Sequence, residues 1–273
     1  MKLASYDGGF GRVEGTTFIP MGPDLLSYLR TGASTDAGAQ PLREVELHAP
    51  IARPGKVIGV GLNYRDHAEE SGQPIPEEPI LFPKFANSVV GPGEEVEIPP
   101  VVEQCDYEAE LLVVIGRRAS RVSENRALDY IAGYSCANDV SARDLQFRSP
   151  QWMLGKAIDT FLPTGPWIVT PDELPDPQDL GIRCLVNGEA LQDSSTKQMI
   201  FGVAELVAFI TRTLTLEPGD VIATGTPPGV GMARKPPRWL HDGDEVTVEI
   251  ERIGALTNRV RTLEAPTRDG GSG

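Results

Sequence analysis

Short apolar runs separated by glycine and proline recur along the chain and predict strands joined by turns rather than long helices. The clearest alternation is in DEVTVEIERIG (244–254), where Val246, Val248 and Ile250 share one face and polar residues share the other. EAELLVVIG (108–116) ends in a continuous apolar run, which is typical of a strand buried on both faces. Further strands are expected in KVIGVGLNY (56–64), in IRCLVNGEAL (182–191) with its Asn-Gly hairpin turn, and in DVIATGT (220–226).

Helical periodicity is confined to a few segments. GVAELVAFITRTL (202–214) carries an apolar stripe at helical spacing. SENRALDYIAGY (123–134) has Ser123 as a possible N-cap and predicts a helix that ends at Gly133. LNYRDHAEESG (62–72) is compatible with a short helix. The fold class that follows is a mixed, β-rich α+β protein with a few short helices.

The chain is divided by composition into three parts. Residues 1–52 form a small N-terminal segment, with a boundary near the two prolines of HAPIARPGK. Residues 53–263 contain the strong strand patterns and are expected to form the main domain. The end of the chain, 264–273, is polar and glycine-rich and is expected to be disordered.

The charge balance excludes some classes of function. Twenty-five Lys and Arg against 39 Asp and Glu give a net charge of −14, which disfavours nucleic acid and anionic membranes as partners. No apolar stretch is long enough to span a bilayer, and the first residues lack a secretory signal, so we expect a cytoplasmic protein. Three cysteines without CxxC spacing predict neither a disulfide framework nor a zinc site. An anionic substrate would need local cations or a metal ion.

Carboxylates at the start of the apolar strand are the first candidate chemistry. Asp106, Glu108 and Glu110 would share one strand face, and burying such acids is costly unless a cation compensates them. Asp139 in CANDVSARDLQ could add a third ligand, and three carboxylates suit Mg²⁺ or Mn²⁺. Spacing alone leaves two alternatives open. Asp106, Glu108 and Glu110 could be exposed acids at the start of a strand, and Asp139 could simply cap a helix.

Other polar residues could hold a substrate. Arg143, Gln146 and Lys156 could bind a carboxylate and a keto oxygen of a substrate. The alternative is that Arg143 pairs with a nearby Asp and that the ammonium group of Lys156 reaches solvent. His67 and Glu70, three apart, would face one side of a helix and could act as a general base with its orienting acid, or simply be exposed.

A Gly/Pro-rich loop supplies one more candidate. TGTPPGVG (224–231) follows a predicted strand and could offer backbone N–H groups and a Thr hydroxyl to an anion. It lacks the GK[ST] ending of a P-loop and the GxGxxG of a dinucleotide site, and a tight turn between strands is the alternative.

Together these segments resemble the fumarylacetoacetate hydrolase family. The matching segments lie in family order across residues 55–262: IGVGLNYRDHAEESG, PILFPKFANSVVGPGE, DYEAELLVVIG, GYSCANDVSARDLQ, GKAIDTFLPTGPWIVTPDEL, MIFGVAELVAFITRTLTLEPGDVIATGTPPGVG and DGDEVTVEIERIGALTNRV. The N-terminal fifty residues contribute little to the likeness.

The resemblance implies a mixed β-sandwich roll, usually a homodimer, with a divalent metal, Mg²⁺ or Mn²⁺. It implies roles residue by residue: Glu108, Glu110 and Asp139 as metal ligands, Lys156 as the active-site lysine, Arg143, Gln146 and Thr226 as contacts to a keto acid, and His67 with Glu70 as a water-activating pair on a lid-like segment.

The function expected from this likeness is hydrolysis of the C–C bond of an acylpyruvate, with a small anionic keto acid as substrate. In that reaction His67 would activate the attacking water and the metal would stabilise the departing enolate. An oxaloacetate-type decarboxylase or an isomerase of hydroxymuconate or hydroxyheptadienedioate type is the alternative, because one site can serve all three reactions. A non-catalytic keto-acid or metal-binding protein is the alternative of another class, and it would not need the His67–Glu70 pair.

Overall fold

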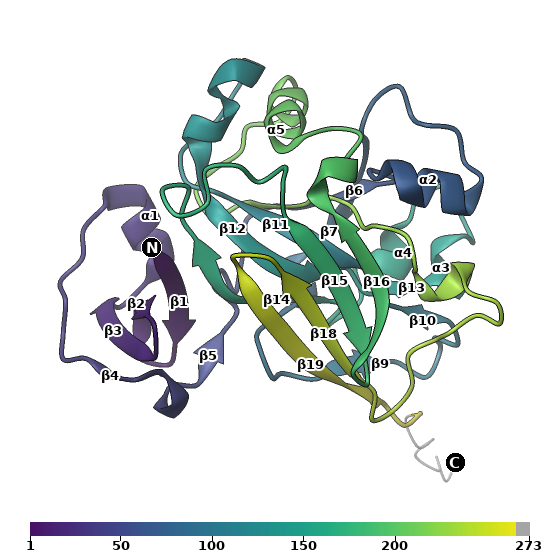
Figure 1. Ribbon diagram of the computed structural model, residues 1–273, viewed down its shortest axis with the longest axis horizontal. Helices are drawn as coiled ribbons and strands as arrows, with labels where there is room; N and C mark the ends of the chain where they lie inside the picture. Colours follow the sequence, from purple (N-terminus) through teal and green to yellow (C-terminus); the bar gives the residue numbers. More distant parts are fainter. Residues whose placement is uncertain (266–273) are drawn as a thin grey trace, which may run out of the picture.

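The computed structural model describes residues 1–265, so the predicted disordered tail lies, apart from its first two residues, outside the described part of the chain. Strands predominate, as the spacing of apolar runs predicts (Figure 1). The strands are β1 (Lys2–Tyr6), β2 (Gly9–Glu14), β3 (Thr17–Gly22), β4 (Gln40–Pro41), β5 (Leu47–His48), β6 (Val57–Gly61), β7 (Ile80–Lys84), β8 (Val89–Val90), β9 (Val96–Ile98), β10 (Cys105–Asp106), β11 (Ala109–Ile115), β12 (Ile131–Asn138), β13 (Ser141–Ala142), β14 (Leu162–Val169), β15 (Gly181–Val186), β16 (Glu189–Ser195), β17 (Val221–Ala223), β18 (Glu245–Ile250) and β19 (Gly254–Thr262).

The helices are short. The α-helices are α1 (Leu25–Thr31), α2 (Arg65–Ser71), α3 (Arg143–Gln146), α4 (Met153–Lys156) and α5 (Val203–Thr211), and the 3-10 helices are η1 (Leu42–Glu44), η2 (Ala86–Ser88), η3 (Glu124–Tyr130), η4 (Thr196–Gln198) and η5 (Gly231–Ala233). The mixed, strand-rich α+β class predicted from the sequence is confirmed.

Two sheets packed face to face form the body of the molecule. The larger has the strand order β4-β3-β2-β1-β14-β12-β11-β17-β6-β7, with β5 on β1 and β8 on β14, and the smaller has the order β16-β15-β18-β19-β9. In Figure 1 the smaller sheet crosses in front of β11 and β12. Leu111 and Val113 of β11 pack into one core with β15 and β18, whereas Leu112 and Val114 belong to a second core on the opposite face. The continuous apolar run therefore forms a strand buried on both faces.

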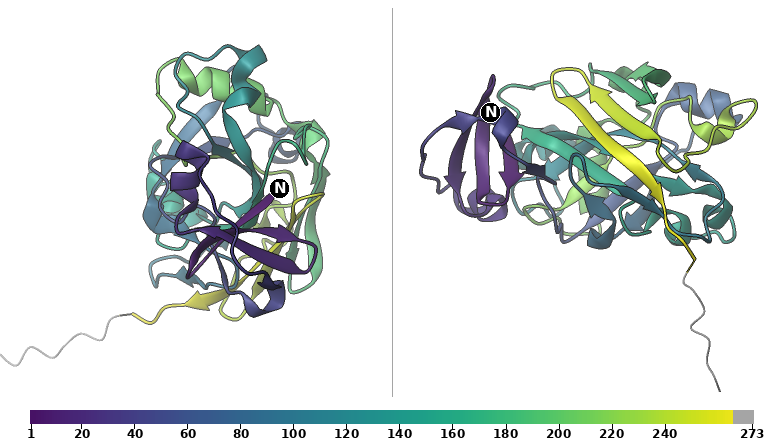
Figure 2. Two further views of the ribbon diagram at one scale, coloured as in Figure 1. Left: turned by 90° about the vertical axis from the view of Figure 1, so that its left-hand side faces the viewer. Right: turned by 90° about the horizontal axis from the view of Figure 1, so that it is seen from below.

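The N-terminal segment joins the larger sheet. Strand β1 pairs with β14 through Lys2–Val169 and Leu3–Ile168, and β2 and β3 continue the sheet outward. Figures 1 and 2 show these purple strands at one end of the molecule, with α1 beside them. Leu3 shares a core with Leu112 and Ile168, so the segment is packed on the main domain as well as paired with it.

The helix predicted over residues 123–134 is wrong in its second half. Only Glu124–Tyr130 is helical, as the 3-10 helix η3, and Ser123 makes no side-chain cap. Residues from Ile131 onward form β12, which pairs with β11 along most of its length. Gly133, expected at a helix end, lies within this strand with φ 158°. Burial of Ile131 and Tyr134 between the layers outweighs the local helical pattern.

The directions of the strands bring the candidate residues together at one edge of the larger sheet, where this edge is a row of strand ends and not an outermost strand. Strands β6 and β17 are parallel, so both of their carboxyl ends lie at this edge. Strand β11 is antiparallel to β17, which places its amino end there, and β12 is antiparallel to β11, which brings its carboxyl end back. The buried amide of Asn63 fixes this edge, because it donates to the Thr224 carbonyl (2.7 Å) and to the Phe201 carbonyl (3.1 Å).

Candidate active site

Three buried carboxylates converge where these strand ends meet. Glu108, Glu110 and Asp139 each offer an oxygen within 4.8 Å of the others. Backbone contacts fix their spacing, since the Asp139 N–H donates to the Glu108 carbonyl (2.9 Å) and the Asn138 side chain accepts from the Glu108 N–H (3.0 Å). The ExE spacing and the distant Asp139 thus form one cluster because β11 pairs with β12.

Two buried lysines neutralise part of this cluster. Lys156 Nζ lies 2.8 Å from Glu108 Oε2 and 2.7 Å from Asp139 Oδ2. Lys84 Nζ lies 2.6 Å from Asp139 Oδ1. Burial alone would lower the pKa of Lys156, but Asp139 and Glu108 outweigh it and raise the pKa. The sequence interpretation missed Lys84, although ILFPKF shows a charge within an apolar segment in the same way as the segment around Lys156.

Arg143 connects the cluster to a second carboxylate. Its Nε donates to Asp106 Oδ2 (2.8 Å), its Nη1 donates to Gln146 Oε1 (2.9 Å), and its Nη2 lies 2.6 Å from Glu108 Oε1. Burial would raise the pKa of Glu108, but Lys156 and Arg143 outweigh it and hold the pKa at about 2. Asp106, which also accepts the backbone N–H of Gly231 (2.6 Å), therefore positions the guanidinium rather than joining the three-carboxylate cluster.

Of the three clustered carboxylates, Glu110 is the one without a cationic partner among residues 1–265. Its Oε2 accepts the Gly225 N–H at 2.9 Å. Gly225 has φ +96°, and a Cβ there would lie 2.7 Å from Asn63 Cβ, so glycine is required at this position. Burial and the charges of Asp139 and Glu108 raise the pKa of Glu110 well above its ordinary value. A divalent cation held by hard carboxylate oxygens would relieve this repulsion, so the residues present fit such an ion.

His67 and Glu70 form a hydrogen-bonded pair on α2. His67 Nδ1 lies 3.1 Å from Glu70 Oε2, and Glu70 Oε1 accepts the Gly229 N–H at 2.9 Å. Asp66 on the same helix accepts a hydrogen bond from Ser194 of β16 (2.5 Å), so α2 is attached on two sides. Because both oxygens of Glu70 act as acceptors, the pair favours a proton on His67 Nδ1 and leaves Nε2 as the basic nitrogen.

One cavity of about 530 Å³ brings these groups together. His67, Glu70, Glu108, Glu110, Arg143, Gln146, Lys156 and Thr226 all line it. The Thr226 hydroxyl donates to the Ala109 carbonyl (2.9 Å) and accepts from Gln192 (2.8 Å). Its hydroxyl hydrogen is thus already used within the protein.

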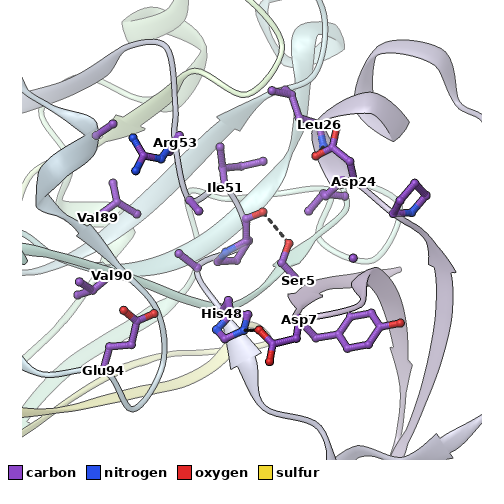
Figure 3. A pocket seen from close by; sticks show the side chains of 18 of the residues that line it. Ser5, Asp7, Asp24, Leu26, His48, Ile51, Arg53, Val89, Val90 and Glu94 are labelled. Carbon is purple, nitrogen blue, oxygen red and sulfur yellow. Dashed lines mark hydrogen bonds and ion pairs between the residues drawn. The ribbon is translucent and has the colours of Figure 1, made fainter.

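A second cavity, about 790 Å³, lies between the N-terminal segment and the main domain (Figure 3). Asp7, Asp24, His48, Arg53 and Glu94 are its charged lining residues, and His48 is paired with Asp7 at 2.7 Å. None of the predicted site residues lines it. Its larger volume is therefore no reason to place the chemistry there.

The chain belongs to the fumarylacetoacetate hydrolase family, because the family model for the fumarylacetoacetate (FAA) hydrolase C-terminal domain matches residues 56–261. The human protein named "Oxaloacetate tautomerase FAHD2A, mitochondrial" is 48% identical over 247 residues, which are 90% of this chain and 79% of that protein. A putative HpcE protein from Mycobacterium smegmatis has a similar structure, with 40% identity and a TM-score of 0.88 over 97% of this chain and 100% of that one.

A third similar protein is the 2-hydroxyhepta-2,4-diene-1,7-dioate isomerase from Mycobacterium marinum. It is 39% identical, with a TM-score of 0.82 over 97% of this chain and 98% of that one. Among the helices in residues 1–265, none has the length and apolar character needed to cross a membrane.

Proposed function

We propose that this protein is a metal-dependent tautomerase of small 2-oxo dicarboxylic acids, with the keto and enol forms of oxaloacetate as its substrate and product. The observation that carries the proposal is the shared cavity, in which a carboxylate cluster suited to a divalent ion faces the His67–Glu70 pair. The names of the human and M. marinum relatives support an isomerase of this kind over the C–C hydrolysis expected from the sequence.

The reaction moves one proton and breaks no carbon–carbon bond. The C3–H bond of the keto acid breaks, its electrons form the C2–C3 double bond, and O2 gains a proton. Mg²⁺ or Mn²⁺, when bound by Glu108, Glu110 and Asp139, would supply a Lewis acid for the enolate oxygen. His67 Nε2 takes the proton from C3 while the carbonyl π electrons move onto O2, and the resulting imidazolium gives the proton to O2. Glu70 holds the ring and stabilises the imidazolium.

A divalent ion would allow the cavity to accept an anionic substrate. Lys84, Lys156 and Arg143 are ion-paired with Asp106, Glu108 and Asp139, and two further carboxylates, Glu70 and Glu110, line the cavity. Three cations therefore face five carboxylates, and a divalent ion would balance this excess of two negative charges in a chain whose net charge is −14. Arg143 and Gln146 are the side chains that can turn toward a substrate carboxylate.

The decisive experiment compares three reactions of one preparation. The protein with Mg²⁺ should accelerate the loss of absorbance of the oxaloacetate enol. Addition of EDTA should return the rate to its background value. Pyruvate formation from oxaloacetate and cleavage of an acylpyruvate should each be slower by at least about 10²-fold. Faster acylpyruvate cleavage than tautomerisation would overturn the proposal and restore hydrolysis as the function.

Mg²⁺ should stabilise the metal-free protein. At a free ion concentration of 100 times its Kd, binding contributes about 2.7 kcal/mol, which for a chain of this size raises the Tm by roughly 5–10 °C. Differential scanning calorimetry with added Mg²⁺, Mn²⁺ and then EDTA measures the shift. A Tm that responds to neither ion would contradict the metal site.

His67→Ala should reduce tautomerase kcat by about 10²-fold or more, the usual contribution of a positioned base. The Mg²⁺-induced rise in Tm should remain, because α2 contributes no carboxylate to the cluster. Glu69→Ala is the matched control, since Glu69 is exposed on the same helix. Loss of Mg²⁺ binding in His67→Ala would show instead that the pair supports the metal site.

A further inference from the structure

The active-site cavity has a charged inner half and an apolar outer half. Its ionisable lining residues are His67, Glu70, Glu108, Glu110, Arg143 and Lys156, and the four buried ones, Glu108, Glu110, Arg143 and Lys156, define the inner half. The rest of the lining is largely apolar and includes Leu62, Ile80, Phe82, Phe147, Trp152 and Met232. A 2-oxo dicarboxylate needs the inner half, but nothing in its chemistry calls for the outer one.

An aromatic wall begins directly beside the charged groups. Lys156 Nζ lies 4.9 Å from the centre of the Phe82 ring, and the Phe82 and Trp152 rings lie 5.6 Å apart at 55°. The indole of Trp152 rests on the backbone of β6, where a Cβ at Gly61 would lie only 2.5 Å from Trp152 Cζ3. The wall is thus fixed by packing, so an apolar group bound next to the keto-acid head would meet a preformed surface.

The exposed lining residues at the mouth of the cavity are of two kinds: Glu70, Ser71 and Gln73 are polar, and Ile80, Phe147 and Met232 are apolar. Ile80, Phe147 and Met232 line it with 39%, 57% and 41% of their surfaces accessible, and they account for three of the ten large apolar side chains exposed in residues 1–265. Side chains of this kind gathered at one opening are typical of a binding surface for apolar groups. The outer half contains no cation among its lining residues that would hold a distal carboxylate.

We propose that the site also tautomerises 2-oxo monocarboxylic acids that carry an apolar or aromatic group on C3. The oxo-acid head occupies the inner half, and the C3 substituent lies against Phe82 and Trp152 and extends toward Phe147 and Met232. This inference rests on the proposed function for the chemistry at C3, and it extends that function to a second class of substrate.

The proton bookkeeping is the same as for oxaloacetate. The C3–H bond breaks, O2 gains a proton, and the C2–C3 bond becomes double, with no oxidant, water or leaving group required. An aromatic ring on C3 conjugates with the new double bond, so the enol has a strong ultraviolet absorbance that reports the reaction.

Phenylpyruvate is the probe, and its enol is followed by ultraviolet absorbance with the Mg²⁺-loaded protein. We expect kcat/KM for phenylpyruvate within about tenfold of that for oxaloacetate, since the ring gains apolar burial while the distal carboxylate is lost. The Glu110→Ala variant under the same conditions gives the rate of ketonisation by buffer and free metal, which is subtracted. Tautomerisation of oxaloacetate without that of phenylpyruvate would overturn this inference alone, whereas turnover of neither would overturn it together with the proposed function.

Variants of the mouth test the placement of the ring. Phe147→Ser should lower the ratio of phenylpyruvate to oxaloacetate kcat/KM by about tenfold, through lost apolar contact. Leu128→Ser is the matched control, because Leu128 is similarly exposed (40%) but lies on η3 and does not line the cavity. The Tm of both variants confirms folding, and Met232→Ser provides a second mouth variant. An unchanged ratio in both Phe147→Ser and Met232→Ser would contradict the outer half as the site of the ring.

Discussion

Replacing Glu110 with alanine should reduce tautomerase activity by at least about 10³-fold, which corresponds to about 4 kcal/mol of transition-state stabilisation. The side chain is 1% exposed, and it supplies one of the three oxygens of the cluster. Without it the ion would be held by two carboxylates that are already bound to lysines. Steady-state kinetics and calorimetric titration with Mg²⁺ measure the loss. Glu103→Ala, at an exposed position before β10, should behave as the unaltered protein.

The isosteric change Glu110→Gln separates the charge of this residue from its shape. Burial, Asp139 and Glu108 raise the pKa of Glu110, so its protonated form is favoured in the folded, metal-free state. The raised pKa stabilises the folded state fully at pH values below about 4.5, which is the pKa of this side chain in the unfolded protein. The stabilisation is lost as the pH rises toward the pKa of Glu110 in the folded protein. At pH 8 the metal-free Gln variant should therefore be at least as stable as the unaltered protein. A clearly lower Tm for the Gln variant would refute this account of the cluster.

Lys156→Met should lower both stability and activity. Removing the ammonium leaves Glu108 and Asp139 with one buried cation fewer, and breaking a buried pair costs about 3–5 kcal/mol. The activity at saturating Mg²⁺ should fall at least about 10²-fold, because repulsion within the cluster would displace the carboxylates from the ion. Chemical denaturation with and without Mg²⁺ measures the first effect, and Mg²⁺ should restore part of the lost stability.

Lys197→Met is the matched control for Lys156→Met. Lys197 Nζ lies 2.6 Å from Asp179, a distance as short as those of Lys156, but its side chain is 62% exposed. An exposed pair of this kind contributes about 0–1 kcal/mol. Equal losses of stability in the two variants would show that burial of the ion pair is not the source of the effect.

Much of the fold follows from periodicity, and the parts that do not are set by long-range packing. The alternation at 245–250 and the apolar run at 109–115 appear as β18 and β11, with the expected faces buried. The segment at 123–134 fails because burial against β11 decides the state of Ile131 and Tyr134, and no local pattern encodes that partner. The pairing of β1 with β14 is equally invisible in the first fifty residues.

In the candidate site, too, some features follow from the sequence and others depend on long-range packing. Residue types and resemblance identify Glu108, Glu110, Asp139, Arg143, Lys156 and the His67–Glu70 pair. All of them except Asp139, which is fully buried, line one cavity. Their contacts could not be predicted. Lys84 of β7 reaches Asp139, which lies 55 positions away in the chain, and Asp106 binds Arg143 rather than joining the three-carboxylate cluster because Gly231 holds its carboxylate.

The pairing of β6 with β17 governs when the site can form during folding. Lys56 and Asp220, hydrogen-bonded at the start of these parallel strands, are 164 positions apart in the chain. Closing so long a loop is entropically costly, and folds built on such distant pairings are slow to form. Because β6 leads directly into α2, the His67–Glu70 pair cannot meet the carboxylates before this closure. Recovery of activity from the denatured chain therefore reports completion of the sheet, not the earlier formation of its hairpins.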